Sequence, residues 1–131
     1  MKEEIAKNDF YELYADTAKN RLYYTIKGYW ASPSDAPENY NDFLKTVEKL
    51  SKGFDAVVDL REMKPAPEDV AELHIRTQKL VVAKGISRSA DIVDSAMISI
   101  VIGRYDRESA RFKKAFATVE EGEKWLDSFK K

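Results

Sequence analysis

The stretch that most constrains the fold of this chain is residues 54–61, a short apolar run with β-branched residues at its centre. Gly53 precedes it, polar residues follow it, and an amphipathic helical pattern lies on either side. A buried parallel strand between two crossover helices has this pattern. The run ends at Asp59 and Arg61, and ligand sites in open α/β sheets form at the carboxyl ends of strands. Residues 54–61 therefore predict the centre of the fold and the first place to look for a functional site.

Two aromatic-rich segments precede this strand, at residues 10–15 and 21–30. In the second segment apolar residues at every other position indicate a strand, and Gly28 indicates a bulge or a close backbone approach. The short polar stretch between the two segments predicts a turn. The sheet is therefore expected to begin with an antiparallel hairpin.

Two amphipathic helices are predicted around the strand of residues 54–61. Each follows a proline-containing segment, which a first helical turn tolerates because its N–H groups have no intrahelical partner. The first helix is expected to end at Gly53 and the second at Gly85, where a left-handed conformation can terminate a helix. This order of elements is typical of a parallel or mixed sheet.

The C-terminal part of the chain alternates short strands with helices. Residues 90–94 and 112–116 are strand candidates, and the two lysines of the second suit an exposed edge. The final helix opens with Thr118 and Glu121 at the spacing of a capping box.

Residues 95–105 are ambiguous. Their β-branched content fits a buried strand, whereas their length and lack of alternation fit a helix, and periodicity alone does not decide. We favour a helix over about residues 95–109, capped by Asp94 or Ser95. Its buried side would carry every fourth residue: Met97, Val101 and Tyr105.

Length and composition bound the class of protein. The 131 residues predict one α/β domain, 1–131, in which an N-terminal antiparallel hairpin and then β-α units form a mixed sheet of four to five strands with about four helices. The chain has no cysteine and one histidine, which excludes thiolate metal sites, and no window near the roughly 20 apolar residues of a membrane span. Its 22 Lys+Arg and 23 Asp+Glu lack the basic excess of nucleic-acid binders. Residues 1–8 lack the apolar core of a signal peptide, so we expect a cytoplasmic protein.

Over nearly its whole length the sequence resembles the STAS domain, and within it the SpoIIAA-like branch of small bacterial proteins. Four segments carry the resemblance: residues 27–30, 59–61, 90–95 and 115–126. The resemblance implies a mixed sheet with helices packed on it and no cofactor. It also implies a non-enzymatic role in signalling, or in binding proteins or small ligands.

One local match concerns Ser95. In the anti-sigma factor antagonists of this family a strand ends in Asp-Ser-Ser-Gly, and one serine is phosphorylated at the start of the next helix. Here the segment is Asp94-Ser95-Ala96-Met97, so the second serine and the glycine are replaced. We therefore interpret Ser95 as a helix cap, with regulated phosphorylation of Ser95 as the alternative.

The predicted ligand or partner surface consists of five residues: Asp59, Arg61, Asp94, Ser95 and Trp30. Both aspartates end candidate parallel strands, so they should meet at one edge of the sheet. Two carboxylates could serve acid–base chemistry or hold a divalent cation, but the sequence offers no nucleophile motif or glycine-rich loop beside them. We favour structural roles, an Asp59–Arg61 pair and a cap at Asp94, and assign no catalytic residue and no metal site.

His74 and three arginines complete the candidates. We interpret His74 as a residue at the border of the core satisfied by a hydrogen bond, with pH sensing or ligand binding as the alternative. Arg104, Arg107 and Arg111 recur at helical spacing, but acidic residues interrupt them. This pattern favours an exposed face of mixed charge over a patch for anions, phospholipids or acidic partners.

The function that we expect is that of a non-enzymatic regulatory or protein-binding module without nucleic-acid partners. A homodimer is one form it could take, because the hairpin supplies a sheet edge and Tyr23, Tyr29 and Trp30 supply apolar area. The first alternative is a carrier of a small apolar or lipid-like ligand, with residues 97–102 and the hairpin aromatics as pocket wall. The second alternative is an enzyme that uses the two strand-end aspartates.

Overall fold

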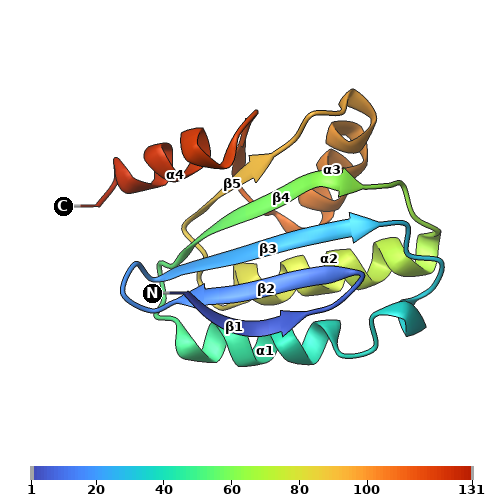
Figure 1. The fold of residues 1–131 in the computed structure, drawn as a ribbon, viewed down its shortest axis with the longest axis horizontal. Helices are drawn as coiled ribbons and strands as arrows, with labels where there is room; N and C mark the ends of the chain where they lie inside the picture. Colours follow the sequence, from blue (N-terminus) through green and yellow to red (C-terminus); the bar gives the residue numbers. More distant parts are fainter. Residues whose placement is uncertain (1, 131) are drawn as a thin grey trace.

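The computed structural model describes residues 2–130. The elements of this part of the chain are, in order, β1 (Lys2–Lys7), β2 (Tyr11–Asp16), β3 (Arg21–Gly28), the 3-10 turn η1 (Pro33–Asp35), α1 (Asn39–Lys49), β4 (Asp55–Met63), α2 (Glu68–Ala83), β5 (Arg88–Ile92), α3 (Ala96–Ser109), β6 (Lys113–Phe116) and α4 (Val119–Asp127). The strands form one sheet in the order β1-β2-β3-β4-β5-β6. Helices α1, α2 and α3 share one apolar core with the sheet, and α4 packs on the opposite face in a second, smaller core (Figure 1). No helix within residues 2–130 is long and apolar enough to cross a membrane.

The sheet is mixed. Strands β1, β2 and β3 are antiparallel neighbours, whereas β3, β4, β5 and β6 pair in parallel. Each parallel connection runs through a helix, α1, α2 and α3 in turn, as parallel neighbours require a long crossover. The predicted hairpin, β-α units and α/β class are confirmed.

The six strands of the described residues exceed the four to five that the sequence predicts, and the additional strand is β1. Four of its six residues are Lys or Glu, and most of its side chains are exposed. It lies at the edge of the sheet, where charged side chains discourage pairing with other chains. Such a strand needs no apolar alternation, so its sequence carries no burial pattern.

β4 is a central strand, as predicted. Ala56 and Leu60 face the core that contains α1, α2 and α3, whereas Val57 faces α4. Opposite Ile26 of β3, β4 has one residue more than its neighbour, which makes a bulge. The strand continues through this bulge to Met63, two residues beyond its predicted end.

A buried cation attaches α4 to the sheet. Arg21 of β3 is buried, and its guanidinium contacts Asp55 at 2.7 Å, Glu123 at 2.8 Å and Asp127 at 2.9 Å. A buried charge is tolerated when it is paired and hydrogen-bonded in this way. The helix begins at the predicted capping box, with Thr118 as its N-cap.

α3 confirms the helical interpretation of the ambiguous segment. Ser95 is its N-cap, and the Ser95 hydroxyl accepts a hydrogen bond from the Ile98 N–H at 3.2 Å. The predicted buried side is partly wrong, because Met97 is exposed while Ile98 and Ile102 are buried with Tyr105. Apolar residues occupy most positions in the first half of this helix, so the sequence does not specify which side faces the sheet.

Candidate functional site

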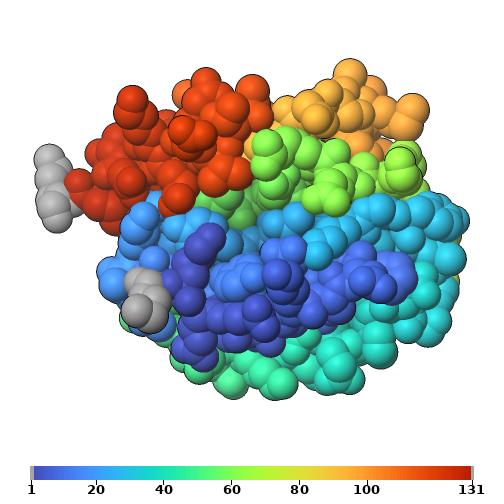
Figure 2. Space-filling view, viewed as in Figure 1, coloured from blue at the N-terminus to red at the C-terminus, as the bar shows by residue number. Residues whose placement is uncertain are grey.

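An ion pair between Asp59 and Arg61 lies near the carboxyl end of β4. Arg61 donates from Nε to one carboxylate oxygen of Asp59 at 2.9 Å and from a terminal nitrogen to the other at 2.7 Å. In the space-filling view α4 covers the start of β4 and leaves its carboxyl end at the surface (Figure 2). Burial opposes ionisation of Asp59, but the hydrogen bonds from Arg61 outweigh it and lower the pKa of the carboxyl.

Asp94 and Ser95 lie at the same edge of the sheet. Ile92, the last residue of β5, is the register partner of Asp59, and Asp94 follows two residues later. The hydrogen bonds and charge of Asp59 raise the pKa of Arg61, and the charge of Asp94 adds to this effect. The structure therefore brings Asp59, Arg61 and Asp94 together, as the sequence predicts. Among the described residues, no three acidic or histidine side chains gather into a group that could hold a metal ion.

Exposed apolar side chains of α3 extend this edge. Met97 and Ile100, in the first two turns of the helix, are 62% and 74% exposed. Residues three apart lie on the same side of a helix, so the two side chains are neighbours. The sequence interpretation missed this surface because it placed Met97 on the buried side. We refer to the following residues as the α3 edge: Asp59, Arg61, Asp94, Ser95, Met97 and Ile100.

Trp30 does not belong to a surface. It is buried, and its indole N–H is 3.1 Å from the carbonyl oxygens of Phe10 and Lys27, to which it donates. Tyr23 is also buried, which leaves Tyr29 as the exposed member of the three aromatics expected to supply a dimer contact. The prediction of Trp30 as a contact residue is therefore wrong. Trp30 instead belongs to the main core, where the sheet packs against helices α1, α2 and α3.

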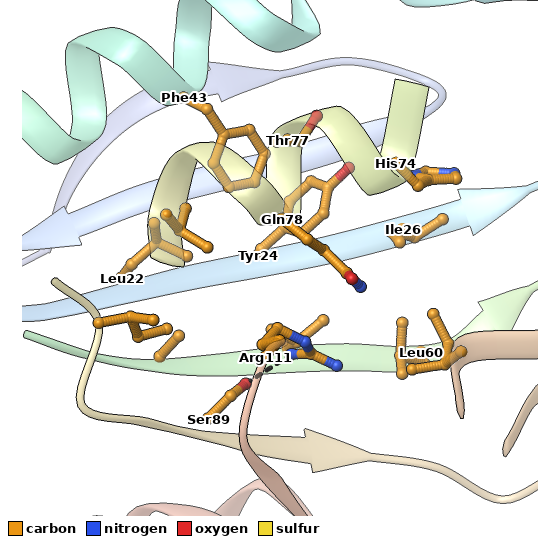
Figure 3. A pocket seen from close by; sticks show the side chains of 15 residues that line it. Leu22, Tyr24, Ile26, Phe43, Leu60, His74, Thr77, Gln78, Ser89 and Arg111 are labelled. Atoms are coloured by element: carbon orange, nitrogen blue, oxygen red, sulfur yellow. Dashed lines mark hydrogen bonds between the residues drawn. The ribbon is translucent and has the colours of Figure 1, made fainter. Parts of the chain in front are cut away.

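A cavity lies between the sheet and helices α1, α2 and α3. It offers about 50 Å³ to the centres of water-sized molecules. Its wall is mostly apolar and comes from several strands and helices (Figure 3). Tyr24 of the hairpin and Ile102 of α3 belong to the wall, as expected for an apolar-ligand site, whereas Met97 does not.

His74 of α2 reaches this cavity from inside the core and is 5% exposed. Its ring centroid lies 4.7 Å from that of Trp30 and 5.7 Å from that of Tyr105. Within residues 2–130 neither imidazole nitrogen has a hydrogen-bond partner, so the predicted border position with a satisfied hydrogen bond is wrong. Burial lowers the pKa of His74 to about 4, and the ring is therefore neutral at neutral pH.

Arg111 lines another side of the cavity and is buried, whereas the sequence placed it on a surface of mixed charge. It donates to Asp91 at 2.5 and 2.9 Å, to Asp106 at 2.7 Å and to Ser89 at 2.9 Å. Lys113 pairs with the other oxygen of Asp106 at 2.9 Å. The positive charges of Arg111 and Lys113 therefore balance the negative charges of Asp91 and Asp106. The signal for this cluster was an aspartate inside an apolar strand, since a buried carboxylate requires a cation.

Comparison with known proteins supports the fold. No protein-family model matches the chain, and no curated protein is significantly similar to it. Among solved structures it is similar to an uncharacterized protein from the DUF3478 family, with a SpoIIAA-like fold, from Shewanella loihica PV-4. The TM-score is 0.61, the similarity covers 92% of this chain and 97% of that chain, and the sequence identity is 14%. The chain therefore has the SpoIIAA-like fold that its sequence implies.

Proposed function

We propose that this SpoIIAA-like domain is a non-enzymatic protein-binding module and that the α3 edge is its contact surface. The observation that carries the proposal is the exposure of Met97 and Ile100, at 62% and 74%. Covering such apolar surface contributes about 25 cal/mol per Å². Asp94 and Ser95 directly precede α3 in the chain, and exposed apolar residues beside polar ones are typical of interaction sites.

The state of the polar groups supports a binding role over a catalytic one. Arg61 holds Asp59 ionised through two hydrogen bonds, which makes the carboxylate a weak proton acceptor. The Ser95 hydroxyl is engaged as a helix cap. Phosphorylation of Ser95 is the alternative means of regulation, because a phosphate would add negative charge to the α3 edge.

Site-specific photo-crosslinking tests this proposal. A benzophenone amino acid in place of Ile100 is expected to cross-link a single protein partner in cells of the native host. The matched control replaces Phe112, which is 62% exposed but follows the opposite end of α3. A cross-link to a second copy of the chain would identify the partner as the protein itself. Equal cross-linking from both positions, or none from position 100, would contradict the proposal.

Charge substitutions supply the second measurement. Replacing Met97 and Ile100 together by glutamate should abolish the cross-linked complex, since two carboxylates would have to be desolvated in the contact. Both side chains are exposed, so the thermal unfolding of the free protein should hardly change. A complex that forms equally well with the double variant would contradict the α3 edge as contact surface.

The cavity favours a second function, that of a carrier or sensor of a small molecule. It concerns a different part of the molecule from the exposed side chains of the α3 edge. Its volume and its polar groups restrict the kind of ligand that it can hold.

A further inference from the structure

The size of the cavity sets the size of a ligand. A site of about 50 Å³ holds about four water-sized groups, because each needs roughly 10–15 Å³ measured in this way. It is about a third of the engineered cavity of about 150 Å³ that binds benzene in another protein. A long acyl chain is too large for this space, so the lipid-like ligand that the sequence suggested is disfavoured. A molecule of a few non-hydrogen atoms fits.

The mostly apolar wall of the cavity favours a ligand whose larger part is apolar. Most of the lining belongs to the main hydrophobic core of the domain. Figure 3 shows the side chains around the space, including Leu22, Tyr24, Ile26, Phe43 and Leu60. These side chains offer water few hydrogen-bond partners, so an apolar group gains by filling the space between them.

One polar side chain of the wall makes no hydrogen bond at all within the described residues. His74 is 5% exposed and has no hydrogen bond within residues 2–130. Its polar neighbours differ in this respect: Thr77 donates to Asn39 and to a backbone carbonyl, and Asn39 donates to Tyr24. The imidazole of His74 is therefore free to hydrogen-bond to a molecule in the cavity.

The charges of the wall exclude an ionic ligand. Asp91 and Asp106 already neutralise Arg111, which donates to both carboxylates and to Ser89. The imidazole of His74 carries no charge at neutral pH. A carboxylate or an ammonium ion would therefore enter the cavity without a counter-charge, at a large desolvation cost.

We propose that the cavity binds a small uncharged molecule, with an apolar body of a few non-hydrogen atoms and one hydroxyl or carbonyl group that hydrogen-bonds to His74. Neutral imidazole offers one donor and one acceptor, so it can serve either group. The proposal rests on the second function, the binding of a small molecule in the cavity, and is independent of the α3 edge. Half-buried Gln78, whose carbonyl accepts from Ser109 at 2.7 Å, can contribute its amide nitrogen as an additional donor.

Nuclear magnetic resonance with probes of matched size tests the ligand class. The probes are 2-propanol, acetone and acetate, which have the same number of non-hydrogen atoms, and xenon, which measures the apolar space alone. We expect 2-propanol and acetone to shift the methyl signals of Ile26, Leu60 and Ile102 and the ring signals of His74 in a saturable way. Acetate at the same concentration and at neutral pH should leave these signals unchanged. Binding of acetate as strong as that of 2-propanol would overturn the proposal.

Two substitutions then separate the apolar space from the hydrogen bond. His74→Phe keeps an aromatic ring between Trp30 and Tyr105, so xenon should still bind while the affinity for 2-propanol falls about tenfold. Ile102→Phe fills the cavity and should abolish binding of both probes while His74 remains. Absence of xenon binding to the unmodified protein would refute the cavity function itself. Xenon binding with equal affinity of 2-propanol for His74→Phe and the unmodified protein would refute only the role of His74.

Discussion

Replacement of Arg111 by methionine is the most direct test of how the domain holds its buried charges. Arg111 makes two hydrogen bonds to Asp91, which is 0% exposed, and one to Asp106. Removing one partner of a buried ion pair costs about 3–5 kcal/mol, because the other charge stays buried. Lys113 still pairs with Asp106 in the variant, so the loss falls on Asp91 and we expect about 3 kcal/mol. For a domain of this size that corresponds to a decrease in Tm of about 10 °C.

Urea unfolding, followed by the fluorescence of buried Trp30, measures this loss. The matched control is Arg104→Met. Arg104 also forms two hydrogen bonds to one carboxylate, that of Glu68, at 2.6 and 2.9 Å, but both side chains are exposed. Exposed pairs contribute little because water solvates the separated charges, so the control should lose far less stability than the Arg111 variant. The comparison separates burial from hydrogen-bond geometry.

A second substitution provides the refuting result. Asp91→Asn in the Arg111→Met background removes the buried, unpaired charge of Asp91 and should recover most of the lost stability. Asp91→Asn alone should be destabilising. An Arg111 variant that unfolds at the same urea concentration as the Arg104 variant would refute the reasoning. So would a double variant that is less stable than Arg111→Met.

Three further predictions concern single residues. Since the pKa of His74 is about 4 in the folded state and 6.5 for an exposed imidazole, protonation favours the unfolded state below pH 6.5. The free energy of unfolding should fall by about 2 kcal/mol from roughly pH 7 to pH 5 in urea titrations, and His74→Phe should lose this part of the pH dependence. Ser95→Ala should cost about 1 kcal/mol in thermal unfolding, whereas Ser95→Asp, which keeps a cap acceptor, should stay close to the unmodified protein; equal losses would contradict the role as a cap. Gly85→Ala should cost about 1–2 kcal/mol, because its φ is +98° and a Cβ would lie 2.6 Å from Lys52 Cγ. Gly53→Ala, at φ +92° with no atom within 4 Å of the added Cβ, should lose less stability than Gly85→Ala when both are measured by thermal unfolding.

Local patterns were sufficient for most of the elements. The apolar run at residues 54–61 predicted β4, and the spacing of Thr118 and Glu121 predicted the start of α4. Ser95 was recognised as one of two cap candidates because short polar side chains at that position bind the free N–H groups of the first turn. β1 was not predicted, because a charged edge strand has no apolar alternation. The features that were predicted depend on the nearest residues in the chain, which the sequence displays directly.

The candidate sites were predictable only where neighbouring strands define them. The carboxyl ends of β4 and β5 meet because parallel strands end at one edge, so Asp59, Arg61 and Asp94 could be placed together from the sequence. Met97 and Ile100 could not be recognised as exposed, because a helix rich in apolar residues can be turned in more than one way toward the sheet.

The sequence by itself determined the α/β class, the order of most elements and the edge at which the charged residues gather, because hydrophobic periodicity and capping act over a few residues. Only the tertiary structure decided that Trp30 and Arg111 are buried and that His74 lacks a hydrogen bond. His74 packs between Trp30 and Tyr105, which are far from it in the chain, and Arg111 donates to Asp91 on β5. Burial and hydrogen bonding of these side chains depend on how distant elements pack together, and no local pattern contains that information.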